Sequence, residues 1–86
     1  MIKIFDFWST WCKPCQILSP TIEKIANDNL NIILEKVDVD DNPALAQEYS
    51  ITNIPTLVFL KDGKEVNRSI GVIPSDKILD IISKIE

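Results

Sequence analysis

Apolar side chains occupy both faces of the first extended segment, from Met1 to Trp8. One face carries Ile2, Ile4 and Trp8, and the other carries Phe5 and Phe7. Burial of both faces is typical of a central strand in a sheet that helices cover on both sides. Side chains alternate along an extended chain, so Asp6 shares a face with Ile4. The pattern therefore places one carboxyl group on an otherwise apolar face.

A helical spacing follows this strand over residues 13–28. Its apolar positions recur every three or four residues, at Ile17, Leu18, Ile22, Ile25 and Ala26. Pro20 is expected to bend the helix, because it removes one backbone donor and crowds the preceding turn. Residues 32–39 are β-branched and apolar, which predicts a second strand. Strand, long helix and strand predict a right-handed crossover between parallel strands.

The second half of the chain predicts four further elements. These are a short helix over 43–49 that begins with proline, a strand over 56–60, a hairpin turn at 61–64 and a strand over 65–70. The last helix begins at Pro74-Ser75-Asp76, with Ser75 as N-cap. Its predicted buried stripe is Ile78, Leu79, Ile81, Ile82 and Ile85. The order β-α-β-α-β-β-α predicts an α/β fold: a mixed four-stranded sheet flanked by three helices.

The composition narrows the classes of function. A chain of 86 residues with 45% apolar positions is expected to form a single domain over residues 1–86. The net charge of −4 argues against a nucleic-acid partner. Apolar runs such as Leu57 to Leu60 fall far short of the roughly 20 residues that span a bilayer, and no secretory signal pattern is present. We therefore expect a cytoplasmic protein with no membrane partner, although a mature secreted chain would show the same pattern. The absence of histidine excludes imidazole catalysis and histidine-ligated metal.

The two cysteines lie three residues apart, where the first strand meets the long helix, in Trp11-Cys12-Lys13-Pro14-Cys15. A helix N-terminus presents free N–H groups and partial positive charge, which stabilise a thiolate. Cys12 is therefore expected to be an exposed nucleophile with a lowered pKa. Cys15, one turn into the helix, is expected to be more shielded and to act as the resolving thiol. Pro14 suits an early helical position.

Three other interpretations of the cysteine pair stay open. A structural disulfide over so short a loop constrains the unfolded chain little. A zinc site needs about four ligands and would require two chains to share their pairs. Chance spacing of two inert core cysteines is the third. The position between strand and helix favours redox chemistry over all three.

The segment Phe5 to Cys15 resembles the active-site strand and turn of the thioredoxin family. Residues 37–43, 49–51, 54–57, 59–63 and Gly71 resemble further landmarks of that family in the same order. The similarity covers nearly the whole chain. It implies a thioredoxin-like fold and a protein-disulfide oxidoreductase that uses a reversible Cys12–Cys15 disulfide, holds no cofactor or metal, and receives electrons from a separate reductase.

The resemblance also assigns roles near the cysteines. Cys12 matches the attacking cysteine, Cys15 the resolving one, and Asp6 a buried acid that exchanges a proton with the resolving thiol. An unpaired carboxylate in an apolar strand independently predicts a raised pKa for Asp6; the alternative is that Asp6 points into solvent. Lys36 matches a family lysine near this acid, although a strand lysine that reaches water fits equally well.

A substrate-binding surface is implied as well. Pro55 matches the family cis-proline, which packs across from the cysteine pair and leaves the Ile54 backbone free to pair with an extended substrate. The remaining implied contacts surround the cysteines: Trp11, Lys13, Pro14, Gly71, Val72 and Ile73. Ile73 alternatively only covers the last helix. Trp8 and Tyr49 are interpreted as packing residues.

The chain departs from the family pattern in two places. Lys13 stands where the family usually has glycine, and a cation there is expected to lower the pKa of Cys12 by about half a unit and make the disulfide more oxidising. The family normally has a further strand and helix ahead of the active-site strand, with which this chain begins. We therefore expect an uncovered sheet edge and face. The protein is expected to be a monomer that either has a polar surface on this face or self-associates weakly through it.

Other functions fit the same fold. One is a glutathione-linked, glutaredoxin-like reductase, and others are an oxidase or an isomerase. Pro14 and the neighbouring Trp11 resemble thioredoxin more closely than glutaredoxin. A binding module that does not use its thiols is the alternative from another class. No glycine-rich nucleotide motif is present, so electrons are expected to come from a partner protein.

Overall fold

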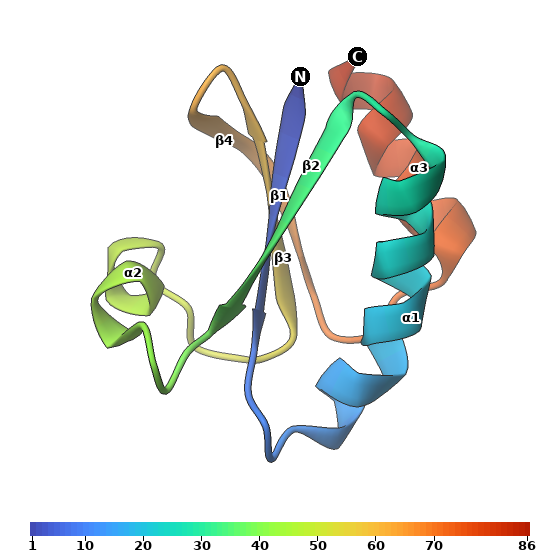
Figure 1. The fold of residues 1–86 in the computed structure, drawn as a ribbon. Helices are drawn as coiled ribbons and strands as arrows, with labels where there is room; N and C mark the ends of the chain where they lie inside the picture. The colour runs from blue at the N-terminus through green and yellow to red at the C-terminus, as the bar shows by residue number, and fades with distance from the viewer.

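All seven predicted elements are present in the computed structural model, which describes residues 1–86 (Figure 1). Their bounds agree with the predicted ones to within one residue. The strands are β1 (Ile2–Trp8), β2 (Ile32–Asp38), β3 (Thr56–Lys61) and β4 (Lys64–Ile70), and the helices are α1 (Lys13–Asp28), α2 (Pro43–Glu48) and α3 (Ser75–Ile85).

The strands form one mixed sheet in the order β2-β1-β3-β4. β1 and β2 are parallel, as the crossover through α1 requires, and the remaining neighbours are antiparallel. Helices α1 and α3 cover one face of the sheet, and α2 covers part of the other (Figure 1). The hairpin between β3 and β4 turns at Asp62 and Gly63, both with positive φ (54° and 80°). Two positive φ values are what a two-residue hairpin needs, and the Asp-Gly pair supplies them.

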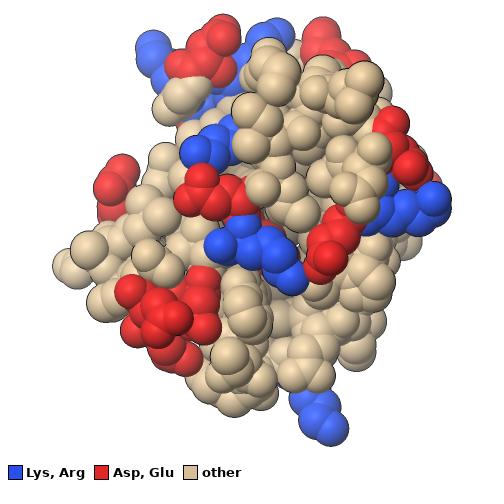
Figure 2. Space-filling view, viewed as in Figure 1, with Lys and Arg blue, Asp and Glu red and all other residues tan.

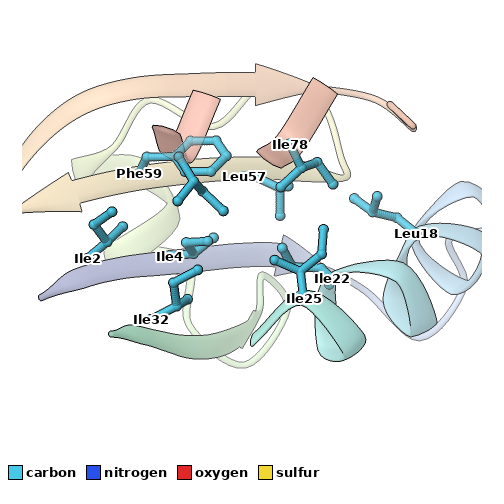
Figure 3. Packing of buried hydrophobic residues seen from close by; sticks show 10 residues of the cluster. Ile2, Ile4, Leu18, Ile22, Ile25, Ile32, Leu57, Phe59 and Ile78 are labelled. Carbon is cyan, nitrogen blue, oxygen red and sulfur yellow. The ribbon is translucent and has the colours of Figure 1, made fainter. Parts of the chain in front are cut away.

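The larger core lies between the sheet and helices α1 and α3 (Figure 3). Its ten buried residues are Ile2, Ile4, Leu18, Ile22, Ile25, Ile32, Leu57, Phe59, Ile78 and Ile82. Burial of one such side chain contributes about 1.5–3 kcal/mol before entropy is counted. This cluster therefore fixes α1, and with it the cysteine pair at the start of α1, against the sheet.

A smaller cluster on the opposite face of the sheet contains Phe5, Phe7, Val37, Val58 and Leu60. The Tyr49 ring packs beside it, with centroids 5.5 Å from Phe5 and 6.0 Å from Phe7. The packing role predicted for Tyr49 is confirmed. Since Ile2 and Ile4 face α1 while Phe5 and Phe7 face α2, the prediction that β1 is buried on both faces is also confirmed.

The predicted burial of Leu79 is wrong, and Ile17, an apolar position in the helical spacing of α1, is exposed as well. Ile17 is 64% exposed and Leu79 is 44% exposed. Ile17 precedes the buried Leu18, and Leu79 follows the buried Ile78. One step along a helix turns the side chain by about 100°. Helix α1 therefore packs through Leu18 and its i+4 neighbour, and α3 packs through Ile78 and its i+4 neighbour, with the adjacent residue turned toward water.

The predicted N-cap of α3 is also wrong. Pro74 occupies the cap position in an extended conformation, with no capping hydrogen bond from a side chain, and Ser75 is the first helical residue. Proline has the φ that a residue entering a helix requires and no N–H that needs a partner. The helix thus begins without the hydroxyl cap that the sequence indicated.

One edge and part of one face of the sheet carry no further element among residues 1–86 (Figure 1). β2 is an edge strand, and its Ile33 is 46% exposed. Beside α2 the sheet carries a groove of about 530 Å³. Its lining is mainly apolar and consists of Met1, Lys3, Phe5, Ile33, Tyr49, Leu60, Asp62 and Gly63. Apolar side chains therefore lie beside the charged Lys3 and Asp62 on this face.

Ser50 ends helix α2 in a left-handed conformation, with φ of 54°. Its N–H donates to Gln47 O (3.0 Å), and the N–H of Ile51 donates to Ala46 O (2.9 Å). This C-terminal motif favours glycine, because a Cβ is strained at positive φ. We expect Ser50→Gly to raise the free energy of unfolding by about 0.5–1 kcal/mol, measured by urea denaturation. Ser50→Ala is the control; an equal gain there would show that loss of the hydroxyl, not relief of strain, is responsible.

Candidate active site

The register of the sheet brings four segments to one end of the molecule. Phe7 near the end of β1 lies opposite Thr56 at the start of β3, and Thr56 lies opposite Ile70 at the end of β4. Trp8 pairs with Asp38 at the end of β2. The loops around residues 9–15, 39–42, 52–55 and 71–74 therefore meet at this end, and all the predicted site residues except Asp6 lie in these loops or in the first turn of α1.

Cys12 and Cys15 form a disulfide, with their Cα atoms 5.3 Å apart. Cys12 is the N-cap of α1, and its Sγ accepts a hydrogen bond from the Cys15 N–H (3.2 Å). Lys13 and Pro14 are the first two helical residues. The bond therefore lies at the helix start, where the Cys15 N–H already points at the Cys12 sulfur, and N–H groups in this position stabilise sulfur anions.

The predicted exposure of Cys12 is wrong for this oxidised form. Cys12 is 4% exposed and Cys15 is 3% exposed. The bond to Cys15 and the hydrogen bond from the Cys15 amide draw the Cys12 sulfur back over the first turn. The two cysteines still differ in position, because Cys12 precedes the helix and Cys15 lines a cavity behind it.

Asp6 is buried beneath the cysteine pair, at 2% exposure, and its Oδ1 has no hydrogen-bond partner. Burial raises the pKa of Asp6 from 3.8 to about 6; the Lys36 charge opposes this rise and the Glu23 charge adds to it. Asp6 and Cys15 line the same cavity of about 70 Å³. The alternative in which Asp6 points into solvent is excluded.

Lys36 lies beside Asp6 in the parallel register of β1 and β2. Its Nζ donates to Ser19 Oγ (2.5 Å) and Glu23 Oε2 (2.9 Å) and lies 5.4 Å from the centre of the Trp8 ring. The sequence placed Lys36 near Asp6 but did not identify Ser19 and Glu23. Their spacing of four residues, which puts both on one face of α1, was the available signal.

The residues around the disulfide divide into exposed and packed groups. Trp11 (68%) and Val72 (47%) are exposed, and so are Lys13 and Pro14. Ile54, Gly71 and Ile73 are partly buried, and Pro55 is buried. Ile73 packs against the larger core, which fits the alternative in which it covers the last helix.

Pro55 follows a cis peptide bond from Ile54, as the resemblance implied. The N–H of Gly71 donates to Pro55 O (2.8 Å), so the loop after β4 is fixed to the loop before β3. Gly71 has a φ of 86°, where glycine is favoured. Trp11 and Ile54 together line a pocket of about 180 Å³. An apolar, partly hollow surface therefore adjoins Cys12.

The orientation of Trp11 depends on a residue that sequence analysis missed. The Trp11 Nε1–H donates to Asp40 Oδ2 (3.0 Å). Asp40 belongs to an acidic group with Asp38 and Asp41, and Figure 2 shows acidic side chains gathered where β2 ends and the chain leads into α2. The run Asp38-Val39-Asp40-Asp41 at the end of a predicted strand was the signal in the sequence, and the Asp40 N–H donates to Asp38 Oδ1 (2.9 Å) in the turn that brings these acids together.

No three His, Cys, Asp or Glu side chains lie close enough together to hold a metal ion. None of the three helices combines the length and the hydropathy that crossing a membrane requires.

The similarity of the chain to known proteins agrees with this geometry. The thioredoxin family model matches residues 2–84. The chain is 43% identical over 83 residues to a thioredoxin of Chlamydia trachomatis serovar D, and 38% identical over 84 residues to a thioredoxin of Staphylococcus epidermidis. Each alignment covers 96% of this chain and 81% of the relative.

Solved structures give the same result. The thioredoxin of Fasciola hepatica superposes with a TM-score of 0.91 at 39% identity, over 99% of this chain and 81% of that one. Oxidised mitochondrial thioredoxin 3 of Saccharomyces cerevisiae gives 0.87 at 33% identity, over 95% and 77%. With its four-stranded sheet, three helices and disulfide at the start of α1, the chain belongs to the thioredoxin family and is a thiol-disulfide oxidoreductase with the thioredoxin-like fold.

Proposed function

We propose that the protein reduces disulfides in other proteins through Cys12 and Cys15. The Cys12 thiolate attacks one sulfur of a target disulfide, the target S–S bond breaks, and the other target sulfur leaves as a thiolate. The Cys15 thiolate then attacks Cys12 Sγ and releases the first target sulfur. The target gains two electrons and the Cys12–Cys15 pair loses two. The observation that carries this proposal is the disulfide at the N-terminus of α1, with Asp6 behind it.

Asp6 is proposed to take the proton from the Cys15 thiol before the second attack. Its position in the same cavity as Cys15 supports this role. A pKa of about 6 leaves most of the carboxyl ionised at neutral pH while keeping it a stronger base than an ordinary aspartate. Lys36 is the nearby cation that partly stabilises the ionised form.

The substrate is proposed to lie extended along the loop that ends at Pro55. Ile54 makes no backbone hydrogen bond within the chain, so its N–H and C=O are available to a substrate strand. Trp11 and Val72 offer exposed apolar contacts on either side, Ile73 and Gly71 complete the surface, and Lys13 and Pro14 border Cys12. Unfolded or flexible protein segments fit such a shallow surface.

The dithiol form is proposed to be restored by a separate reductase, with no cofactor bound to this chain. A reducing compartment, the cytoplasm, fits a cysteine pair that cycles between dithiol and disulfide. Residues 1–86 are proposed to act as one domain and as a monomer. The uncovered groove beside α2 predicts at most weak self-association, which sedimentation at high and low concentration measures.

Reduction of insulin disulfides tests the proposed function. We expect turnover when a thioredoxin reductase with its reduced nicotinamide cofactor supplies electrons, and little with glutathione and its reductase. The variant Cys12→Ser, Cys15→Ser is the matched control and should be inactive with either donor. Turnover with glutathione alone would favour the glutaredoxin-like alternative, and a double variant that keeps its biological activity would favour the thiol-independent binding module.

Lys13 is exposed and forms no salt bridge, so its charge is free to act on the neighbouring sulfur. A cation that stabilises the reduced thiolate makes the disulfide more oxidising. Lys13→Gly is therefore expected to make the reduction potential more negative by about 15 mV, which is about threefold in the exchange constant. Equilibration with glutathione measures this change. Lys13→Arg keeps the charge and should keep the potential; an equal shift in both variants would contradict the electrostatic cause.

A further inference from the structure

Two residues of α1 without a role in the proposed function hold Lys36 in place. Lys36 Nζ donates to Ser19 Oγ (2.5 Å) and to Glu23 Oε2 (2.9 Å), and Ser19 Oγ donates to the same Glu23 oxygen. The hydroxyl thus accepts one hydrogen bond and donates one, and the three groups close a triangle. In Figure 2 basic and acidic side chains meet over the gap between β2 and α1. Ser19, Glu23 and Lys36 are named the lysine anchor.

The lysine anchor lies where the cavity behind Cys15 meets solvent. Ser19 and Lys36 line this cavity of about 70 Å³ together with Asp6 and Cys15. The Lys36 and Glu23 side chains are 35% and 48% exposed, whereas Asp6 is buried. A cavity of this size, with the unpartnered Asp6 carboxyl oxygen on one of its lining residues, has room for a water molecule. The lysine anchor therefore borders the cavity that Asp6 and Cys15 share.

Lys36 acts on Asp6 through space, because no hydrogen bond joins them and its donors point to Ser19 and Glu23. The charged groups that act on Asp6 are Lys36 from β2 and Glu23 from α1, with opposite effects on its ionisation. β3 places the uncharged Leu57 opposite Asp6. The other titratable group at the cavity is the Cys15 thiol of the reduced form.

We propose that Ser19 and Glu23 are positioning residues for the proton transfer between Cys15 and Asp6. They hold the Lys36 ammonium at the cavity mouth and so limit how strongly it stabilises the Asp6 carboxylate. Asp6 thereby stays basic enough to take the proton from Cys15 Sγ, whose electron pair stays on the sulfur. The inference rests on the proposed function, since it requires Asp6 to be the proton acceptor.

The Asp6 carboxyl carbon, followed by NMR during a pH titration of the oxidised protein, tests the anchor. Glu23→Gln removes the opposing charge and frees Lys36 to approach Asp6, so the Asp6 midpoint should fall by about half a pH unit. Ser19→Ala should lower it by less, because Glu23 still holds Lys36. Asp28→Asn, which removes a carboxylate from the exposed Lys24–Asp28 pair of the same helix, is the control and should leave the midpoint in place.

The same Glu23→Gln titration in a Lys36→Met protein distinguishes the anchoring of Lys36 from the direct effect of the Glu23 charge on Asp6. Without the ammonium, Glu23→Gln should shift the Asp6 midpoint by less than half as much as in the parent protein. Equal shifts in the two backgrounds would overturn the proposal, because Glu23 would then act only as a distant charge. No shift on Glu23→Gln would overturn it as well, and no shift on Ser19→Ala would remove Ser19 from it.

Stopped-flow kinetics of mixed-disulfide resolution distinguish this proposal from the proposed function. Asp6→Asn should slow resolution by about tenfold or more, and Glu23→Gln should move the acid limb of the pH profile down by the same amount as the NMR midpoint. An unchanged rate for Asp6→Asn would disprove the role of Asp6 and the anchor with it. A slowed Asp6→Asn beside an unmoved profile for Glu23→Gln would disprove the anchor alone.

Discussion

Cys15→Ser is expected to convert the protein from a turnover catalyst into a trap for its substrates. Cys12 still attacks a target disulfide, but a serine hydroxyl is not ionised at neutral pH and does not displace the bound target. Insulin turnover should fall by more than about 1000-fold. Mass spectrometry should show a stable adduct that a strong reductant removes. The expectation follows from the pairing of Cys12 and Cys15 at the start of α1.

Cys12→Ser is the matched control for the trap. Its turnover should fall equally, but no adduct should accumulate, because Cys15 lines the inner cavity and lies within the helix. Adducts of similar yield on both variants would show that either cysteine attacks targets. Adducts on Cys12→Ser alone would reverse the proposed roles.

Asp6→Asn is expected to stabilise the protein at neutral pH while slowing its chemistry. The pKa of Asp6 rises from 3.8 to about 6 on folding, so the folded state binds the proton more tightly than the unfolded state. The associated stability is fully present below pH 3.8 and is lost as pH rises through about 6. This loss amounts to about 3 kcal/mol, and an uncharged asparagine should avoid most of it.

Urea unfolding of the oxidised proteins at several pH values measures this effect. Asp6→Asn should exceed the parent by about 2–3 kcal/mol at pH 7.5, and the difference should shrink to about 0.5 kcal/mol near pH 4. Asp80→Asn, at an exposed ion pair on α3, is the control and should leave the pH dependence unchanged. Equal stability of Asp6→Asn and its parent at pH 7.5 would contradict the buried, ionised state of Asp6.

Local sequence signals predicted most of the fold, because short-range physics decides those elements. The alternation of Ile4 and Phe5 on the two faces of β1 required a sheet covered on both sides, and the structure has one. The Asp62-Gly63 pair has the two positive φ values that a tight hairpin needs. The position of both cysteines between a strand and a helix also placed the redox site correctly.

The sequence did not predict which way a helix turns about its own axis. Ile17 and Leu79 fit the helical spacing as well as their buried neighbours, but packing against the sheet turns them to solvent. The burial of Cys12 was missed for a related reason, since it depends on the bond to Cys15 rather than on the position of Cys12 in the chain.

The sequence also did not predict the contacts between distant segments. The hydrogen bond from Trp11 to Asp40 joins the first loop to the loop after β2. The contact of Lys36 with Glu23 crosses from β2 to α1. Both depend on register and side-chain reach, which the sheet topology sets. Asp40 and Glu23 therefore emerged only from the structure, whereas the cysteines, Asp6 and Lys36 were named from the sequence.

The central claim is that Cys12 is the attacking thiolate and Cys15 the resolving one. Because both are buried alike in the oxidised form, the most direct measurement is limited alkylation of the reduced protein by iodoacetamide near pH 6, followed by peptide mass mapping. We predict modification of Cys12 almost alone, since only Cys12 caps the helix at the outer end of the pair. Modification of Cys15 first, or of both at equal rates, would contradict the account.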